Sequence, residues 1–311
     1  MIAAIGAFDG FHKGHQTLLR VAEKRANESG TGWGIITFEH HPEALLVSPK
    51  FKILFTIRER RMLEKLFHIP ASARLAFTNE LFQMTPIQFL DYIAGEFGVL
   101  GVVVGEKFRF GRGRSGNAGL LAHESRKREW VFDAIPLLHD SEGSVISSTA
   151  IREAVARGDM TRAWDMQGYP FFCVSRVVHG NERGRALGYP TANLDIGPEK
   201  VSMRYGVYAT LVYAMGKWHI GAANAGINPT FDDVEGMRFE VNLQAFDGDL
   251  YGREITVFII EHVRDEIRFD GLGSLKERMR DDARVIGEIG ARAMERCPEL
   301  WEALGNTMSQ Y

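Results

Sequence analysis

Two histidines, His12 and His15, lie in a glycine-rich segment near the start of the chain, residues 6–15. An apolar run over residues 2–5 predicts a buried strand before it, and the apolar spacing over 16–23 predicts a helix after it. Glycines let a backbone approach a ligand closely, and a helix N-terminus offers unpaired N–H groups to a phosphate. The two imidazoles add side-chain donors. The segment therefore predicts a phosphate site without the Walker lysine, although a tight strand-to-helix corner is the alternative interpretation.

A second group of phosphate-binding candidates consists of Ser147, Ser148 and Thr149, followed by Arg152. Hydroxyls before a helix are ordinary N-caps, and capping is the default interpretation of such a string. The same hydroxyls and N–H groups can hold a phosphate, with the arginine one turn inside the helix. The segment is thus a candidate phosphate site or a plain cap.

A third candidate segment, residues 105–116, follows the apolar run 102–104, which predicts a buried parallel strand. Arginine binds phosphate through its planar fork, phenylalanine offers an apolar face to a ring, and glycine allows close approach. The alternative is a solvated basic loop. The segment holds Phe108, Arg109, Phe110, Gly111 and Arg112.

The composition is that of an ordinary globular protein of two domains, with 311 residues, 45% hydrophobic, 25% charged and a net charge of −3. This charge gives no basic field, so we expect neither nucleic acid nor an anionic membrane as a partner. The longest apolar run, residues 97–104, is too short to span a membrane, and we expect no signal peptide. Cys173 and Cys297 show no ligand spacing and favour a cytoplasmic protein with reduced thiols.

Helix and strand patterns alternate up to about residue 169, which predicts a parallel α/β sheet in domain 1–169. Strand patterns dominate domain 170–311 and predict a small antiparallel β-barrel. Ser274 and Glu277 have the spacing of a capping box, which predicts the start of a final helix. On spacing alone, Glu240 is an ordinary solvent-facing strand residue between two apolar neighbours.

Taken together, these strings resemble the bacterial bifunctional riboflavin kinase/FAD synthetase family, and the resemblance runs from about residue 2 to 286. The first domain carries G-x-F-D-G-x-H-x-G-H, G-x-x-F-R-F-G-x-x-R-x-G and I-S-S-T-x-[IV]-R. The second carries strings similar to G-x-x-x-G-R-x-L-G-[FY]-P-T-A-N, A-N-I-G-x-x-P-T-F, the G-D-L-Y-G turn and R-x-E-x-K-F. Departures from the family pattern occur at His40, Lys107, Ala225, Asn242 and Arg268. Family members usually have residues before the first strand, which leaves open a start codon upstream of Met1.

The resemblance implies a Rossmann-like nucleotidyltransferase domain that adenylylates FMN to FAD and a flavokinase barrel that phosphorylates riboflavin to FMN. It implies ATP as co-substrate, riboflavin, FMN and FAD as substrates or products, and Mg²⁺. In the first domain it implies His12 and His15 as catalytic donors and an ATP site of Gly6, Phe8, Asp9, Gly10, Gly14, Ser147, Ser148, Thr149 and Arg152. The flavin or phosphate loop would be Phe108, Arg109, Phe110, Gly111 and Arg112. In the second domain it implies Glu240 as the base, Thr191 and Asn193 as Mg²⁺ ligands, and ATP or flavin binding by Gly180, Gly184, Arg185, Gly188, Pro190, Thr191, Asn193, Arg264 and Phe269.

The two reactions have different chemical needs. A phosphate monoester is already ionised near neutral pH, so adenylyl transfer needs donors and cations rather than a base. A primary alcohol must lose a proton, so the kinase needs a carboxylate near the γ-phosphate.

Three alternatives to a bifunctional enzyme stay open on the sequence. They are a flavin-binding protein with an inactive adenylyltransferase half, a pantetheine-phosphate or nicotinate-mononucleotide adenylyltransferase, and a class I tRNA synthetase. Intact histidines, the barrel domain and the absence of a K-M-S-K-S-like string argue against them in turn. We expect small-molecule substrates as partners, and the sequence allows a weak homo-oligomer.

Overall fold

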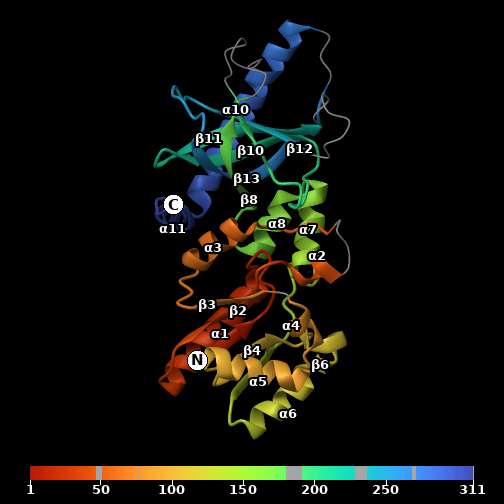
Figure 1. Ribbon diagram of the computed structural model, residues 1–311. Helices are drawn as coiled ribbons and strands as arrows, with labels where there is room; N and C mark the ends of the chain where they lie inside the picture. Colours follow the sequence, from red (N-terminus) through yellow and green to blue (C-terminus); the bar gives the residue numbers. More distant parts are fainter. Residues whose placement is uncertain (47–50, 77, 180–190, 228–236, 268–270, 311) are drawn as a thin grey trace. The chain divides into compact units, whose positions relative to one another are not determined.

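The computed structural model of this chain describes residues 1–46, 51–76, 78–179, 191–227, 237–267 and 271–310 (Figure 1). The chain forms two compact units. The first contains residues 1–51 and 63–148, and the second contains residues 52–62 and 149–311. The chain therefore passes from one unit to the other three times, at residues 51–52, 62–63 and 148–149.

The first unit is built on a five-stranded parallel sheet of order β3-β2-β1-β4-β7. Its strands are β1 (Ile2–Ile5), β2 (Trp33–Phe38), β3 (Ser72–Leu75), β4 (Gly101–Gly105) and β7 (Val131–Ile135). Every residue of β1 is buried, as expected for a short apolar strand at the centre of a parallel sheet. The chain runs outward from β1 to β2 and β3 and then returns to the other side of β1 as β4. The gap between β1 and β4 is consequently the topological switch point, where open α/β sheets bind ligands.

Helices and a short hairpin connect these strands. They are α1 (Lys13–Ser29), α2 (Pro42–Leu46), α4 (Asn79–Gln83), α5 (Pro86–Phe97), the strands β5 (Arg109–Phe110) and β6 (Gly116–Asn117), the 3₁₀ turn η1 (Arg112–Arg114) and α6 (Ala118–Lys127). Helix α1 buries Leu18, Leu19, Ala22 and Ala26 and ends at Gly30 in the left-handed region. Helix α5 begins with a complete capping box between Thr85 and Gln88 and has Pro86 at its first position.

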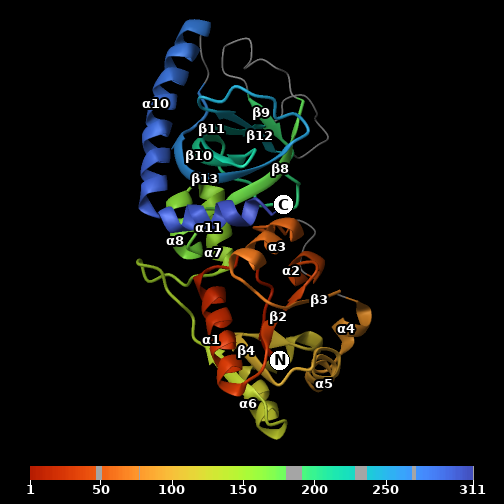
Figure 2. The same cartoon turned by 90° about the vertical axis from the view of Figure 1, so that its left-hand side faces the viewer.

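The second unit is built around a closed barrel of order β10-β11-β12-β9-β8-β13, whose neighbouring strands are antiparallel (Figure 2). Its strands are β8 (Phe172–Val178), β9 (Ala192–Leu194), β10 (Gly206–Ala214), β11 (Lys217–Ile227), β12 (Met237–Leu243) and β13 (Glu254–Arg264). Buried aromatic side chains, among them Tyr208, Phe239 and Phe258, contribute to its core. Closure leaves no unpaired sheet edge along most of the strands.

The remaining helices are α3 (Ile57–Leu66), α7 (Ser148–Arg157), α8 (Met160–Gln167), α10 (Leu272–Arg296) and α11 (Pro298–Met308). Helix α11 follows α10 after a single residue, Cys297. It is held by Trp301, which is fully buried and contacts the rings of Trp218 and Phe258. The predicted capping box is wrong. The N-cap of α10 is Gly271, and Ser274 lies one turn inside and donates its hydroxyl to the Gly271 carbonyl.

A buried ion pair connects the segment 52–62 to the rest of the second unit. The Lys200 Nζ donates to Glu59 Oε1 at 2.5 Å, and both side chains are at most 2% exposed. Glu59 also accepts from the backbone N–H groups of Val174 and Thr56. These bonds join α3 to β8 and to the loop before β10.

The predicted fold class is confirmed: a parallel α/β sheet is followed by an antiparallel barrel and C-terminal helices. The sequence did not predict β3, β7 or β9 as strands. In the described part of the chain, none of the helices combines the length and the apolarity that crossing a membrane would require.

Candidate active sites

The glycine-rich segment leaves β1 at its carboxyl end and leads into α1. The arginine-containing hairpin leaves the neighbouring strand β4, also at its carboxyl end. Because parallel strands end at the same edge of a sheet, both segments emerge at the switch point between β1 and β4. The structure therefore places both segments at the same edge of the sheet, and the phosphate site stays a prediction.

His12 is the N-cap residue of α1, and its Nδ1 accepts the backbone N–H of His15 at 3.3 Å. Burial lowers the pKa of His12 to about 4, so the ring is neutral near pH 7. A neutral imidazole whose Nδ1 accepts a hydrogen bond must carry its proton on Nε2. The cap therefore makes His12 Nε2–H a fixed donor at the start of a helix.

His15 stacks on His12, with ring centroids 3.7 Å apart. Its other face meets the ring of Phe8, which is fully buried. A side chain at Gly14 would place its Cβ 3.1 Å from the His12 ring, so the glycine makes room for this pair. The structure thus brings both predicted histidines together and gives the Phe8 ring a supporting role under His15.

The backbone of this loop is strained at two phenylalanines. Phe8 has φ 48° and Phe11 has φ 33°, a region that bulky residues rarely adopt. Such residues cost about 1–3 kcal/mol each and persist where packing holds them in place. Both rings are fully buried and stack on each other, with centroids 5.3 Å apart. Core packing therefore holds the loop in the shape that presents the histidines.

Ser148 connects the second predicted segment to this loop. Its hydroxyl donates to the Asp9 carbonyl at 2.6 Å, across 139 residues of sequence. Ser148 is also the first residue of α7, whose first turn carries Thr149 with its hydroxyl 3.2 Å from the Arg152 guanidinium. The structure brings Ser148 to the loop and shows Thr149 and Arg152 as neighbours on α7.

The hairpin β5–β6 separates its aromatic from its basic residues. Phe110 is buried in the core of the unit and packs on Phe89, and Phe108 stacks on Phe110. Gly111 has φ 69°, and a Cβ there would lie 2.7 Å from the backbone nitrogen of Pro86. Phe110 and Gly111 are thus explained by packing. Arg109 and Arg112 are exposed and form no ion pair among the described residues, so they are free to meet an anion.

In the second unit, three polar residues from different strands lie side by side. Glu240 on β12 pairs in register with Asn193 on β9 and with Asn224 on β11. All three are partly exposed, and their immediate neighbours along each strand are buried. They therefore share the outer face of the barrel, with Thr191 two residues before Asn193 on that face. The structure brings together the predicted base and both predicted Mg²⁺ ligands.

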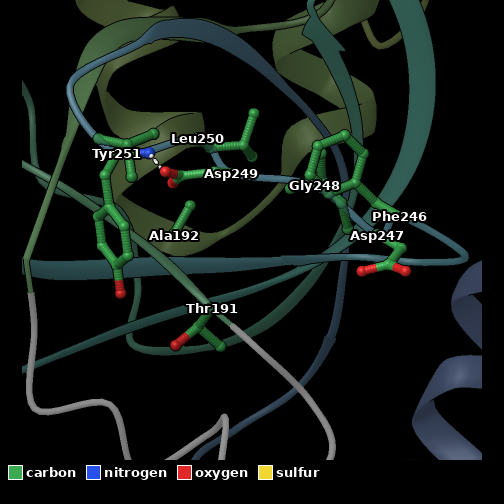
Figure 3. Close-up of a pocket in the computed structure, with 10 residues that line it drawn as sticks. Thr191, Ala192, Phe246, Asp247, Gly248, Asp249, Leu250 and Tyr251 are labelled. Atoms are coloured by element: carbon green, nitrogen blue, oxygen red, sulfur yellow. Dashed lines mark hydrogen bonds between the residues drawn. The ribbon is translucent and has the colours of Figure 1, made fainter.

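A cavity of about 320 Å³ lies in the second unit and has Thr191 in its lining (Figure 3). Its lining includes Thr191, Val177, Leu243 and the turn that joins β12 to β13, residues 246–251. In Figure 3, Thr191 and Tyr251 are drawn to the left of Asp247 and Phe246, and all four residues line the cavity. The Asp249 carboxylate accepts the backbone N–H of Tyr251 at 2.9 Å, so it stabilises the turn. The cavity offers both an aromatic ring and a hydroxyl to a ligand.

Comparison with known proteins covers both units. A family model described as FAD synthetase matches residues 1–150, and one described as riboflavin kinase matches residues 167–289. The bifunctional riboflavin kinase/FMN adenylyltransferase of Escherichia coli strain K12 is 35% identical over 296 residues, which cover 93% of this chain and 92% of that protein. The chain belongs to this family. The member from Listeria monocytogenes is 29% identical over 285 residues, 90% of each chain.

The fold of this family member is also found in a solved structure. A crystal structure described as a macrolide-efflux protein from Streptococcus pneumoniae has a TM-score of 0.83 and 31% identity, covering 92% of this chain and 93% of that one. That protein therefore shares the fold of this chain over most of its length.

Arg264, predicted to bind ATP or flavin, is bound within the protein. Its Nε and Nη2 donate to the Asp282 carboxylate of α10, at 2.9 and 2.6 Å, and its Nη1 donates to the Asp265 carbonyl. Only 13% of the Arg264 side chain and 8% of the Asp282 side chain are exposed. Arg264 thus fastens α10 to the end of β13.

The other predicted kinase residues, Gly180, Gly184, Arg185, Gly188, Pro190 and Phe269, lie outside the described residues, as does the departure at Arg268. Sequence reasoning missed Asn224 and Asp282 as neighbours of this site. The string 223–231 was a signal for Asn224, because it resembles a family motif. No sequence signal marked Asp282, which meets Arg264 only through the fold.

Proposed function

We propose that this chain performs both reactions of its family, with the residue roles given below. The second unit would phosphorylate riboflavin with ATP to give FMN. The first unit would transfer AMP from ATP to FMN, giving FAD and pyrophosphate. The observation that supports this most directly is the pair of separate sites, each with the groups that its own reaction needs.

In adenylyl transfer, the FMN phosphate would attack the α-phosphorus of ATP and displace pyrophosphate. The nucleophile needs no base because it is already ionised. His12 would donate from Nε2 and His15 from its ring, both toward phosphate oxygens at the positive end of α1. Gly6, Asp9, Gly10 and Gly14 would shape the loop, and Ser147, Ser148, Thr149 and Arg152 would contribute further donors. A fixed neutral donor keeps its hydrogen bond over the whole pH range above its pKa.

We propose that the hairpin meets FMN or the phosphates through its arginines. Arg109 and Arg112 are exposed and carry the charge, whereas the Phe110 ring is committed to the core. Phe108, half-buried on Phe110, would offer its remaining face to a ring. This assigns binding in the loop to Arg109, Arg112 and Phe108 and support to Phe110 and Gly111.

In the kinase reaction, Glu240 would accept the proton of the riboflavin hydroxyl as that oxygen attacks the γ-phosphorus. Its place between Asn193 and Asn224 supports this role, because a solvated surface glutamate needs no such neighbours. Thr191 lines the cavity, and the Tyr251 ring, which stacks on His179 with one face, would stack on the adenine with the other. The nucleotide would then extend from the cavity toward Glu240.

Thr191 and Asn193 fit Mg²⁺ as ligands. Both supply neutral oxygens, Asn193 from the outer face of β9 and Thr191 from the residue just before this strand, and ATP phosphates would supply the negative charge. Bound Mg²⁺ would neutralise charge on the β- and γ-phosphates. The protein's own contribution is to hold this amide and hydroxyl beside Glu240.

We further propose that the activities divide near residue 169, between domains 1–169 and 170–311, in a cytoplasmic protein. The two matched segments, 1–150 and 167–289, leave residues 151–166 unmatched, a few residues before this junction. The net charge of −3 supports small-molecule partners rather than nucleic acid, and a weak homo-oligomer stays a prediction. The compact units differ from this division, because residues 52–62 and 149–169 pack with the barrel.

The test is incubation of the purified full-length protein with riboflavin, ATP and Mg²⁺, followed by chromatographic separation of the flavins. We expect FMN first and then FAD. FMN without FAD would leave only the kinase assignment, and the absence of both products would contradict the proposal.

A further inference from the structure

Gly226 is a glycine whose missing side chain leaves a space that another residue fills. It lies on β11 at the position that alternation assigns to the outer face, two residues after Asn224. Gly226 is nevertheless buried. A Cβ at Gly226 would lie 2.5 Å from Glu266 Oε1 and 3.3 Å from its Cδ. The carboxylate of Glu266 therefore covers Gly226, where any larger residue would displace it.

From this position, Glu266 reaches Asn224. The Asn224 Nδ2 lies 3.4 Å from Glu266 Oε1 and donates to it. A carboxylate only accepts hydrogen bonds, so it selects the amide orientation in which Nδ2 faces it. The other end of the amide, Oδ1, then points away from Glu266. Glu266 thus turns Asn224 into an oriented acceptor.

Asn224 is the cross-strand partner of Glu240, the proposed base, which is paired on its other side with Asn193. Directly paired side chains in antiparallel strands lie about 4.5–5.5 Å apart at Cβ. An oriented Oδ1 at Asn224 is accordingly within reach of a hydroxyl that Glu240 deprotonates. A reversed amide would present N–H donors there and compete for the Glu240 carboxylate.

Arg238 supplies a positive charge near the carboxylates of Glu240 and Glu266. It lies on β12 opposite Gly226, the residue that Glu266 covers, and its Nε is 3.7 Å from Glu240 Oε1. Its positive charge therefore lies beside Glu240, on the strand position opposite the glycine that Glu266 covers. A cation in this position weakens the repulsion between the two carboxylates.

We propose that Glu266 is a positioning residue of the kinase site, which acts by orienting the Asn224 amide so that Oδ1 accepts the reacting hydroxyl of the substrate beside Glu240. This inference rests on the proposed kinase function. Glu266 itself does not touch the substrate in this role. Its effect must therefore pass through Asn224, and that dependence can be measured.

The test is a double-mutant cycle on the full-length protein, with riboflavin phosphorylation as the readout. We expect Glu266→Ala to lower kcat roughly tenfold with little change in the KM for ATP, the effect of losing one hydrogen bond to a charged group. Asn224→Ala should lower kcat by at least as much. In the Asn224→Ala background, Glu266→Ala should cause no further loss, because its only route of action is gone.

A second variant moves the carboxylate without removing it. Gly226→Ala should displace Glu266 and lower kcat as Glu266→Ala does, again with no effect in the Asn224→Ala background. Gly273→Ala is its matched control, because a Cβ at Gly273 meets no atom within 4 Å. Glu261→Gln, which changes an exposed carboxylate of β13, is the control for lost charge. The unfolding midpoint of each variant shows whether it loses activity because it unfolds. If one of Glu266→Ala and Gly226→Ala does so, the kcat of the other variant tests the inference.

Two results would overturn the inference: independent losses that multiply in the double variant, or an unchanged kcat in both Glu266→Ala and Gly226→Ala. Failure of the proposed function would look different, since the unsubstituted protein would then form no FMN. Its activity is therefore measured first.

Discussion

Replacing Glu59 with glutamine should destabilise the barrel unit, although Glu59 lies in the part of the sequence that precedes the adenylyltransferase hairpin. Glu59 is bonded to Lys200 and to the N–H groups of Val174 and Thr56. Glutamine keeps the shape but leaves the Lys200 ammonium buried without a counter-charge. The NH₂ group of the glutamine also takes the place of one carboxylate oxygen of Glu59. It then points its own N–H at a group that itself donates a hydrogen bond.

The expected magnitude follows from the burial of the pair. Breaking a fully buried ion pair by removing one partner costs about 3–5 kcal/mol. With an m value of about 2 kcal/mol/M in urea, the midpoint should fall by about 1.5–2.5 M. The Lys200 Nζ also lies 5.0 Å from the ring centroids of Phe55 and Phe171. Aromatic rings therefore surround the ammonium group, and water has little access to solvate its unpaired charge.

The assay is residual kinase activity and intrinsic fluorescence of Glu59→Gln across a urea series. Arg58→Gln is the matched control: Arg58 is the neighbouring residue, and its ion pair with Glu254 is half exposed. A pair of that kind contributes about 1 kcal/mol or less. A Glu59→Gln midpoint no lower than that of Arg58→Gln would refute the assignment of residues 52–62 to the barrel unit.

Four further outcomes are expected. Glu240→Gln should lower riboflavin phosphorylation by roughly 10²–10⁴-fold and leave FAD formation from supplied FMN intact; near-normal kinase turnover would return Glu240 to an ordinary strand residue. His12→Ala combined with His15→Ala should reduce FAD formation by orders of magnitude, since one such donor is worth about 3–4 kcal/mol, while FMN formation continues; equal loss of both would indicate misfolding. Because the folded pKa of His12 is about 4, below its ordinary 6.5, the unfolded chain binds more protons between these values. The free energy of unfolding should then fall by about 3 kcal/mol from pH 6.5 to 4, and His12→Asn, a non-titrating cap, should lack this slope in pH-dependent urea titrations. A fragment of residues 170–311 should make FMN but no FAD, with a lower urea midpoint than the full chain because Lys200 loses Glu59; a folded fragment without kinase activity would contradict the division at 169.

Local patterns in the sequence were sufficient for the order of elements and the position of the candidate loops. The buried run before Gly6, the proline and cap at Thr85-Pro86 and the change to strand patterns after residue 169 each reflect interactions within a few residues. Such interactions are readable without knowing the fold. The same holds for the two histidines, whose helix-start position follows from their immediate neighbours.

Contacts between distant segments were decided by the tertiary structure. Sequence spacing does not reveal that Asn193, Asn224 and Glu240 form one row, because strand register depends on how the barrel closes. Nor does it reveal that Phe110 fills the core while its neighbour Arg109 is exposed, or that Arg264 is held by Asp282. The pairing of Glu59 with Lys200, 141 residues away, is of the same kind. Burial of a charge is tolerated only where a partner arrives from elsewhere in the chain, and that arrival is a property of the whole fold.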